Sequence, residues 1–493
     1  MSSEKVNHSE ELERPSQLSV TELLASENSL LNGLQSVNAW KETFHRPSGA
    51  ILGFMSASYP LGAILSTPFS APISDKFGRR WTILIGSIIM VGGVIMQAAA
   101  NTIGVFIGAR IIVGFGITLA LTTGPILISE LAHPRHRVVF TALYNTSWYL
   151  GALCVAWITY GSARMGSNWA WRLPTAIQAM PAILQIIFIF FLPESPRWLI
   201  YKDRGDEALN ILIKYHGGGD PDDDLVAAEY REITETLHAE KAIKAAGMKL
   251  FITSPANRQR LLILCTLAVA GQWSGNGLVS YYLAKILGTI GIKGQRTQTL
   301  INGLLTTTNW CTAVFAAFMT GKVGRRKMFV LGGIAMFSTF SALTICVAVF
   351  NETASPAAGR AALGLIFIYY TTYNICLNPL FYLYPAEILP FRMRAMGMSI
   401  LVSTNKIALF FNQLVNPVGL DNIGWKYYLV FVVWIAIETT IFYFFFPETL
   451  GHSLEGVGAI FNEIDEKTAM EAKGAHLPKV EQGTTGVEFI ERN

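Results

Sequence analysis

The feature that most constrains the fold is a series of apolar stretches long enough to cross a membrane. A helix needs about 20 apolar residues to span the bilayer core, and lipid offers no partner for an open backbone amide. Only 15% of the 493 residues are charged, against about 25% in soluble proteins. The chain is therefore predicted to be an all-α polytopic membrane protein. Eleven spans are predicted, at 51–73, 82–101, 104–127, 139–162, 173–192, 259–291, 297–320, 327–350, 361–385, 397–418 and 426–446.

Polar stretches divide these spans into five regions. Residues 1–50 are predicted to form a polar tail, and residues 51–195 a first bundle of five spans. Residues 196–258 are charged and include an amphipathic stretch, which indicates a linker with short surface helices. Residues 259–447 are predicted to form a second bundle of six spans, and residues 448–493 a polar C-terminal tail.

Lysine and arginine are enriched in alternate loops, which orients the chain. The richer set, with Arg79, Arg80, Arg135, Arg137, Lys322, Arg325, Arg326, Arg392 and Arg394, is predicted to be cytoplasmic, together with the linker and the C-terminal tail. Asn351-Glu352-Thr353 then falls outside as a glycosylation acceptor. We expect a multi-pass protein of the plasma membrane. The five cysteines lie inside apolar runs without CxxC spacing, which is typical of packing residues.

Three short motifs recur at nearly one offset. Gly78-Arg79-Arg80 returns as Gly324-Arg325-Arg326, an offset of 246 residues. Glu130 and Arg137 return as Glu387 and Arg394, an offset of 257 residues. Pro193-Glu194 returns as Pro447-Glu448, an offset of 254 residues. The repetition predicts two pseudo-symmetric helical bundles, an architecture of transporters that hold substrate between their halves.

The repeat also predicts a span that the first half lacks. Two spans precede the Gly-Arg-Arg loop in the second half, but only one does in the first. The corresponding stretch, about residues 13–45, has no apolar run long enough for a transmembrane helix. Three explanations remain: a translocated N-terminal tail, a cytoplasmic tail with a perturbed first span, or a sequence that omits an exon encoding the helix. The last is the one we favour.

Together the motifs resemble those of a known family. Asp75-Lys-Phe-Gly78-Arg79-Arg80, Pro193-Glu-Ser-Pro-Arg-Trp-Leu199 and Pro447-Glu-Thr-Leu-Gly451 are similar to motifs of the sugar porters of the major facilitator superfamily. The segment GQWSGNGLVSYYL looks most like the corresponding segment of fungal lactose- and hexose-type permeases. The resemblance implies twelve helices, of which the first is missing here except for its outer end at Ser29–Gln35. It also implies sugar transport by alternating access.

The charged motif residues are predicted to form a gate at the cytoplasmic ends of the helices. Asp75 is expected to pair with Arg79 and Arg80, and Glu130 with Arg137. The second-half members are Arg325, Glu387 and Arg394. Gly321 stands where the first half has Asp75, so the second network is expected to lack that acid. The alternative is that these charges only satisfy the positive-inside rule, but arginine alone would do so without the acidic partners.

A sugar site needs a few neutral hydrogen-bonding groups and an aromatic face in an apolar pocket. By resemblance, Gln272 matches the second glutamine of a family motif whose first glutamine is replaced by Gly271 and whose asparagine is replaced by Gly277. Tyr382 stands where many hexose porters have a tryptophan. The candidate sugar-binding residues are Gln272, Asn276, Tyr281, Asn302, Asn309, Tyr382 and Asn405. Interhelical hydrogen bonding is the alternative role for each of them.

Proton coupling is predicted from one intramembrane arginine. Arg110 resembles the family arginine that faces an aspartate of the first helix in proton-coupled members, and Glu27 is the nearest match to that aspartate. The predicted function is sugar transport in symport with protons, by a monomer. A non-transporting member, either a sensor or a truncated pseudo-transporter, is the alternative. No motif for an enzyme, metal, cofactor or nucleic acid was found in the sequence.

Overall fold

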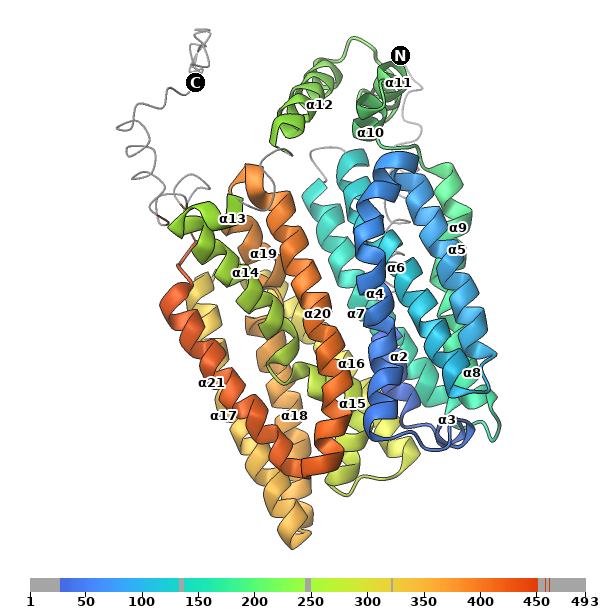
Figure 1. Cartoon of the computed structure of the whole chain (residues 1–493), viewed down its shortest axis with the longest axis vertical. Coiled ribbons are helices and arrows are strands. Elements are labelled where there is room, and N and C mark those ends of the chain that lie inside the picture. The colour runs from blue at the N-terminus through green and yellow to red at the C-terminus, as the bar shows by residue number, and fades with distance from the viewer. Residues whose placement is uncertain are drawn as a thin grey trace, which may run out of the picture.

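In the computed structural model, two helical bundles stand side by side with the linker helices at one end (Figure 1). The structure describes residues 27–132, 137–243, 250–320 and 322–450, together with Val457 and Phe461. Seven helical segments of this described part are long and apolar enough to cross a membrane. They are Gly49–Phe77, Arg79–Ala98, Ile103–Leu131, Trp169–Phe191, Pro255–Thr289, Arg325–Thr353 and Met396–Phe445, with a shorter apolar helix at Leu150–Ser162.

The first bundle contains five predicted spans. Its helices are α4 (Gly49–Phe77), α5 (Arg79–Ala98), α6 (Ile103–Leu131), α7 (Arg137–Ser162), α8 (Trp169–Ile177) and α9 (Ala179–Phe188), followed by the short η3 (Ile189–Phe191). Helices α4 and α6 pack so closely that a Cβ on Gly114 would overlap the Tyr59 carbonyl oxygen. Small residues permit this approach, which provides much of the packing energy between helices in lipid.

The second bundle contains the other six spans, two of which are broken. Its helices are α14 (Pro255–Trp273), α15 (Asn276–Thr289), α16 (Gln295–Met319), α17 (Arg325–Thr353), α18 (Pro356–Cys376), α19 (Leu380–Ile388), α20 (Phe391–Ile423), η4 (Gly424–Tyr427) and α21 (Tyr428–Phe445). The span predicted as continuous over 259–291 is interrupted at Gly275, which has a φ of +96°. The span predicted at 361–385 is interrupted before α19, where Pro379 precedes the helix.

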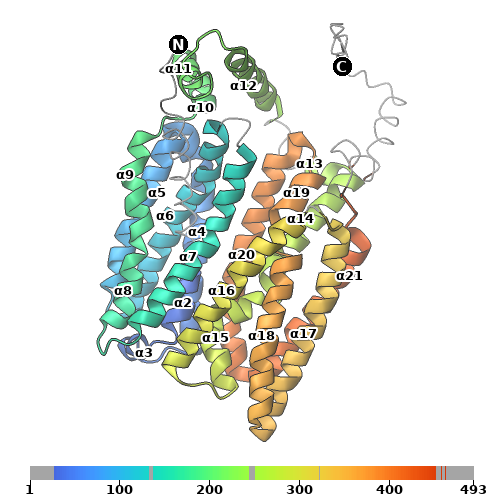
Figure 2. The ribbon, with the colours of Figure 1, turned by 180° about the vertical axis from the view of Figure 1, so that it is seen from behind.

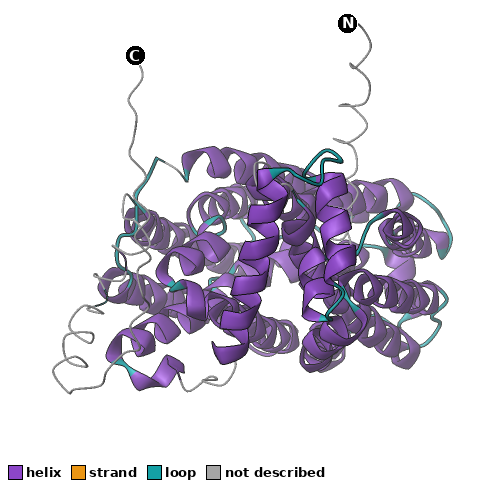
Figure 3. Ribbon diagram, turned by 90° about the horizontal axis from the view of Figure 1, so that it is seen from above, coloured by secondary structure: helices purple, strands orange, loops and turns teal. Residues whose placement is uncertain are grey.

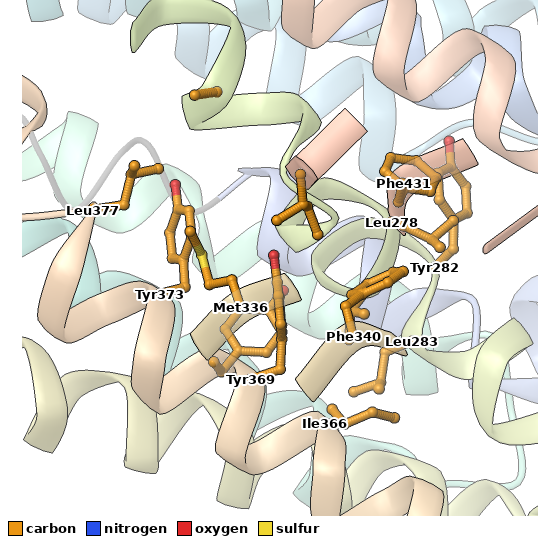
Figure 4. Close-up of a cluster of buried hydrophobic side chains, with 14 of the residues drawn as sticks. Leu278, Tyr282, Leu283, Met336, Phe340, Ile366, Tyr369, Tyr373, Leu377 and Phe431 are labelled. Carbon is orange, nitrogen blue, oxygen red and sulfur yellow. The ribbon is translucent and has the colours of Figure 1, made fainter. Parts of the chain in front are cut away.

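Aromatic side chains fill the core of the second bundle (Figure 4). The Phe340 ring lies 5.3 Å from the ring of Tyr369 and 6.0 Å from that of Phe431, measured between centroids. Leu278 and Tyr282 of α15 are fully buried in the same cluster. This core therefore holds α15 against α17, α18 and α21.

Residues 196–258, predicted to be a linker, contain short helices at one end of the molecule (Figure 2). They are α10 (Pro196–Tyr201), α11 (Gly205–Tyr215), α12 (Asp224–Ile243) and α13 (Leu250–Thr253). Trp198 of α10 donates its indole N–H to the Asp75 carbonyl at 3.0 Å. The His216 ring contacts the Leu131 carbonyl at the end of α6, at 3.2 Å. These contacts attach the linker to the first bundle.

Part of the segment predicted as a polar tail is packed inside the molecule. Helix α2 (Glu27–Leu34) lies against α7 and α15, and Leu30 and Leu34 are fully buried. In the short helix α3 (Asn38–Thr43), Trp40 is also buried. Just beyond α3, Phe44 lies 5.5 Å from the Trp171 ring. The tail boundary at residue 50 differs from the structure because hydropathy does not detect a helix of eight residues whose polar groups are hydrogen-bonded.

The two bundles meet at the end away from the linker. Trp157 of α7 donates to the Thr307 hydroxyl of α16 at 3.2 Å. The Gly49 backbone N–H, at the start of α4, donates to the Asp421 carboxylate of α20 at 2.5 Å. Figure 3 shows the two groups of helices from the linker side. The structure is thus closed between the bundles at the predicted outer end.

Candidate functional site

Three of the predicted sugar-binding residues form one hydrogen-bonded group. The Gln272 amide, near the end of α14, donates to the Asn405 side-chain oxygen of α20 at 3.3 Å. The Tyr281 hydroxyl of α15 donates to the Gln272 side-chain oxygen at 3.3 Å. All three side chains are only partly buried. They therefore bring donors and acceptors from three helices into one partly buried group.

Asn276 belongs to the break between α14 and α15. Its side chain donates to the Gly271 carbonyl at 2.9 Å, and its own carbonyl accepts from Tyr370 at 2.7 Å. These bonds pair backbone groups that the interrupted helix leaves open. The residue sets the shape of the break, and its side-chain amide points back into α14.

Gly271 and Gly277 stand where the family motif has a glutamine and an asparagine, and neighbouring side chains leave no room there for a Cβ atom. A Cβ on Gly271 would lie 2.7 Å from the Phe381 ring and 3.1 Å from the Asn405 amide nitrogen. A Cβ on Gly277 would lie 2.7 Å from the Asn412 side chain. Asn412 in turn donates to the Gln272 carbonyl at 2.5 Å. Side chains of α19 and α20 thus occupy the space that the family's own amides would need.

The two asparagines of α16 form hydrogen bonds with asparagines of α2 and α18. Asn302 accepts from Asn32 of α2 at 3.0 Å, and Asn309 accepts from Asn374 of α18 at 3.0 Å. The Asn32 side-chain oxygen also accepts from the Leu283 backbone N–H at 3.1 Å. Leu283 follows Tyr282, whose φ of −134° and ψ of 28° interrupt the helix. Both asparagines thus form hydrogen bonds between helices in this structure.

Tyr382, near the start of α19, is an exposed aromatic residue. Its side chain is 49% exposed, and its ring meets the Phe381 ring edge-on at 4.9 Å. Phe381 is the aromatic residue that touches the site, since it lies against Gly271. Sequence position alone could not separate these two neighbours, because the break before α19 sets their directions.

The first gate network differs in its pairing from the prediction. Arg79 forms ion pairs with Asp75 at 3.6 Å and with Glu130 at 3.3 Å. Arg80 instead donates its guanidinium to the Phe190 carbonyl at 3.1 Å. The side chain of Arg137, the predicted partner of Glu130, lies outside the described residues.

The second network repeats the first. Arg325 pairs with Glu387 at 2.8 Å, as Arg79 does with Glu130. The Thr449 hydroxyl donates to the same Glu387 carboxylate at 2.5 Å. Gly321 lies outside the described residues. Arg394 is partly buried on α20.

Two acids that the predicted site omitted complete these networks. Glu194 accepts backbone N–H groups from Arg79 and Arg80, and Glu448 accepts those of Arg325 and Arg326. A Cβ on Gly78 or Gly324 would overlap these carboxylates, which explains the glycine of both Gly-Arg-Arg motifs. Burial raises the pKa of Glu194, while the N–H groups of Ser195, Arg80 and Arg79 oppose that shift. The shared offset of the Pro-Glu repeat was the signal that could have identified both acids.

Arg110 is fully buried in α6 and lies close to the first bundle's own groups. It donates to the Ser56 carbonyl at 3.4 Å and lies 5.8 Å from the Tyr59 ring centroid. The ring of Phe106 is 6.0 Å away. The side chain of Glu27, its predicted partner, lies outside the described residues. In the described part, no group of three or more histidines, cysteines or acids is placed to hold a metal ion.

Sequence comparison relates the chain to known transporters. The model of the family described as "sugar (and other) transporter" matches residues 16–461. The sugar transporter STL1 of Saccharomyces cerevisiae is 29% identical over 441 residues, covering 88% of this chain and 77% of that protein. A high-affinity glucose transporter of Kluyveromyces lactis is 28% identical over 453 residues, covering 87% and 80%.

Comparison with solved structures gives the same fold. The inward-open conformation of the xylose transporter XylE from E. coli has a TM-score of 0.74 and 23% identity, covering 91% of this chain and 99% of that one. A D-xylose-proton symporter structure has a TM-score of 0.71 and 21% identity, covering 91% and 100%. The predicted fold class is thereby confirmed. Because the family model matches most of its length, the chain belongs to the sugar transporter family, the sugar porters of the major facilitator superfamily.

Proposed function

We propose that this chain carries a mono- or disaccharide across the plasma membrane by alternating access, as a monomer, in symport with protons. The observation that carries the proposal is the group formed by Gln272, Tyr281 and Asn405 beside the break between α14 and α15. Sugars present many hydroxyls, and neutral amide and phenol groups can exchange their mutual hydrogen bonds for bonds to those hydroxyls.

The gate networks supply the conformational part of the proposal. Arg79 with Glu130, and Arg325 with Glu387, tie helix ends together within each bundle at the linker end. Each bundle can therefore move as a rigid body while the contacts between bundles change.

Proton coupling is supported by Arg110 and by a related protein. A buried intramembrane arginine is a functional candidate by default, and a D-xylose-proton symporter shares this fold. Arg110 lies 54 positions from Ser56 in sequence and contacts it across the α4–α6 interface. Protonation of an acid near Arg110 would change its local charge, and Glu27 is our candidate for that acid.

The test is uptake of a panel of radiolabelled mono- and disaccharides by a transport-deficient host expressing the full chain. We expect saturable uptake that a protonophore abolishes. Gln272→Ala should raise KM about tenfold, because one hydrogen bond to substrate contributes about 1.5 kcal/mol. Gln259→Ala is the matched control, since Gln259 lies on the same helix and donates to the Phe445 carbonyl instead.

A second version of the chain tests the alternative function. In it, an apolar helical segment replaces residues 1–26 ahead of α2. If only this version moves sugar, the sequence as given is a non-transporting member. Uptake of no sugar by either version would overturn the transport proposal, and uptake unaffected by protonophore would overturn proton coupling alone.

A further inference from the structure

A cavity of about 250 Å³ lies between the bundles at the end away from the linker. Tyr160 and the turn residues Ala163 and Arg164 line it from the end of α7, and Gln295 and Arg296 line it from the start of α16. Because α7 belongs to the first bundle and α16 to the second, the cavity exists only where the two bundles meet.

Two positive charges converge in this cavity on one neutral oxygen. Arg164 donates to the Tyr160 hydroxyl at 3.2 Å, and its guanidinium lies 5.0 Å from the Tyr160 ring centroid. Arg296 lines the same cavity, and its charge acts on the same hydroxyl. Both arginines are exposed. Neither forms an ion pair with a carboxylate in the described part of the chain, so their charges repel each other without a counter-ion of the protein.

The start of α16 adds to the positive potential. The N-cap residue Gly294 has no side chain to cap this helix of 25 residues, so no side-chain cap hydrogen bond occupies its first backbone N–H groups. The Gln295 side chain is already used, since it accepts from the Asn38 N–H at 3.0 Å and donates to the Ala163 carbonyl at 2.5 Å. A helix N-terminus favours negative charge.

We propose that this cavity binds a phosphate-type oxyanion, held between Arg164 and Arg296. Guanidinium groups match the geometry of phosphate oxygens and bind them through paired N–H donors. With both arginines turned to the anion, the Tyr160 hydroxyl becomes free to donate as well. The oxyanion is supplied either by inorganic phosphate or by the headgroup of an anionic phospholipid, since the cavity lies at the end of two spans.

Binding at this position has a conformational consequence. If the outer ends of α7 and α16 separate as the bundles move, Arg164 and Arg296 separate with them and the site is lost. The oxyanion therefore binds the conformation that is closed at the outer end better than the open one. A ligand with such a difference in affinity shifts the population toward the closed form. Phosphate outside the membrane would then slow sugar entry without entering the sugar site.

The binding test uses the full chain purified in uncharged detergent, without sugar. Inorganic phosphate is titrated at constant ionic strength against chloride, and the thermal unfolding midpoint is followed. We expect phosphate to raise the midpoint of the wild-type chain. Arg164→Gln combined with Arg296→Gln should weaken the apparent phosphate affinity at least about tenfold. Arg360→Gln is the matched control, because Arg360 is an exposed arginine near the start of α18, at the same end of the molecule.

A second experiment, with defined lipids, distinguishes the two sources of the oxyanion. The chain is placed in nanodiscs of phosphatidylcholine, with or without phosphatidylinositol, in phosphate-free buffer. A midpoint raised only by phosphatidylinositol, and only when both arginines are present, assigns the site to lipid. A response to inorganic phosphate alone assigns it to the soluble anion. Equal responses of wild type and the double variant in both arms would overturn the site.

A distance measurement tests the conformational consequence. Spin labels are attached at Met165→Cys and Lys293→Cys, in a chain whose native cysteines are replaced by serine. The ligand should increase the population with the shorter distance, and the double arginine variant should show no such increase. Binding without any change in the distance distribution would contradict the coupling. Because sugar takes no part in these measurements, their failure is separate from failure of the transport proposal.

Discussion

At the scale of single residues, Arg79 and Arg325 show how the repeated motifs work. Each pairs with an acid at the end of a neighbouring helix, and the backbone N–H of each donates to the glutamate of a Pro-Glu motif. Prediction from sequence identified the arginines and the acids Glu130 and Glu387. The sequence-based prediction missed Glu194 and Glu448, because it looked for acids paired with basic side chains. These two carboxylates accept backbone N–H groups instead, and no charge pattern marks that role.

Arg325→Ala should lower the free energy of unfolding by about 3 kcal/mol, because it leaves the Glu387 carboxylate without its cation in a largely buried position. Thermal unfolding in detergent measures the effect. Arg326→Ala is the control, since its guanidinium contacts the Tyr443 carbonyl at an exposed site. Equal loss in both variants would contradict a specific role for the Arg325–Glu387 pair.

Gly271→Gln restores the family's glutamine but should abolish sugar uptake. Its Cβ would lie 2.7 Å from the Phe381 ring and would displace Asn405. Overpacking of this kind costs about 1–3 kcal/mol, so unfolding at lower temperature should accompany the lost uptake. Gly364→Ala is the matched control, because no atom lies within 4 Å of its added Cβ. Normal uptake by Gly271→Gln would show that the site has more room than the structure gives it.

At the scale of elements, the short helix α2 connects α16 to the interrupted helix α15 through hydrogen bonds. Asn32 is 95% buried, and its amide connects Asn302 of α16 to the open backbone N–H of Leu283. Gln35, just after α2, donates to the Tyr281 carbonyl at 2.9 Å. Hydropathy could not predict this element, since its stability comes from hydrogen bonds to a helix break about 250 residues away in sequence.

Asn32→Ala should destabilise the chain by about 1–3 kcal/mol, because the Leu283 N–H then remains buried without an acceptor. It should also loosen the outer closure, raising the reactivity of a cysteine placed at Gly303, which faces Trp157. Maleimide labelling of Gly303→Cys with and without Asn32→Ala measures this. Asn351→Ala is the control asparagine, exposed at the end of α17. Unchanged labelling would mean that α2 does not hold the outer end closed.

At the scale of the whole molecule, closure at the outer end depends on contacts between the bundles. Gly303 of α16 would bring a Cβ within 3.4 Å of the Trp157 ring, and Trp157 itself bonds Thr307. The pairs within each bundle, such as Arg79 with Glu130, lie at the other end. The molecule thus has rigid halves and a contact surface that can change, which suits alternating access.

A cysteine pair at positions 157 and 303 should form a disulfide under mild oxidation and stop uptake. The bond would hold α7 against α16 and prevent the outer end from opening. Sugar uptake before and after oxidation, and after reduction with dithiothreitol, measures the effect in a chain with Cys154 replaced by serine. Each single cysteine variant serves as control. Full uptake by the cross-linked chain would show that transport needs no separation at this interface.

The sequence by itself determined the all-α membrane fold of two related bundles and the family. Membrane insertion requires long apolar helices, and homologous halves keep their charged motifs at one offset. Tertiary structure alone decided where the helix divides into α14 and α15, that Arg79 also pairs with Glu130, and that Asn302 bonds Asn32. These outcomes depend on which side chains meet after the helices pack, and contacts between residues about 50 to 270 positions apart leave no local pattern.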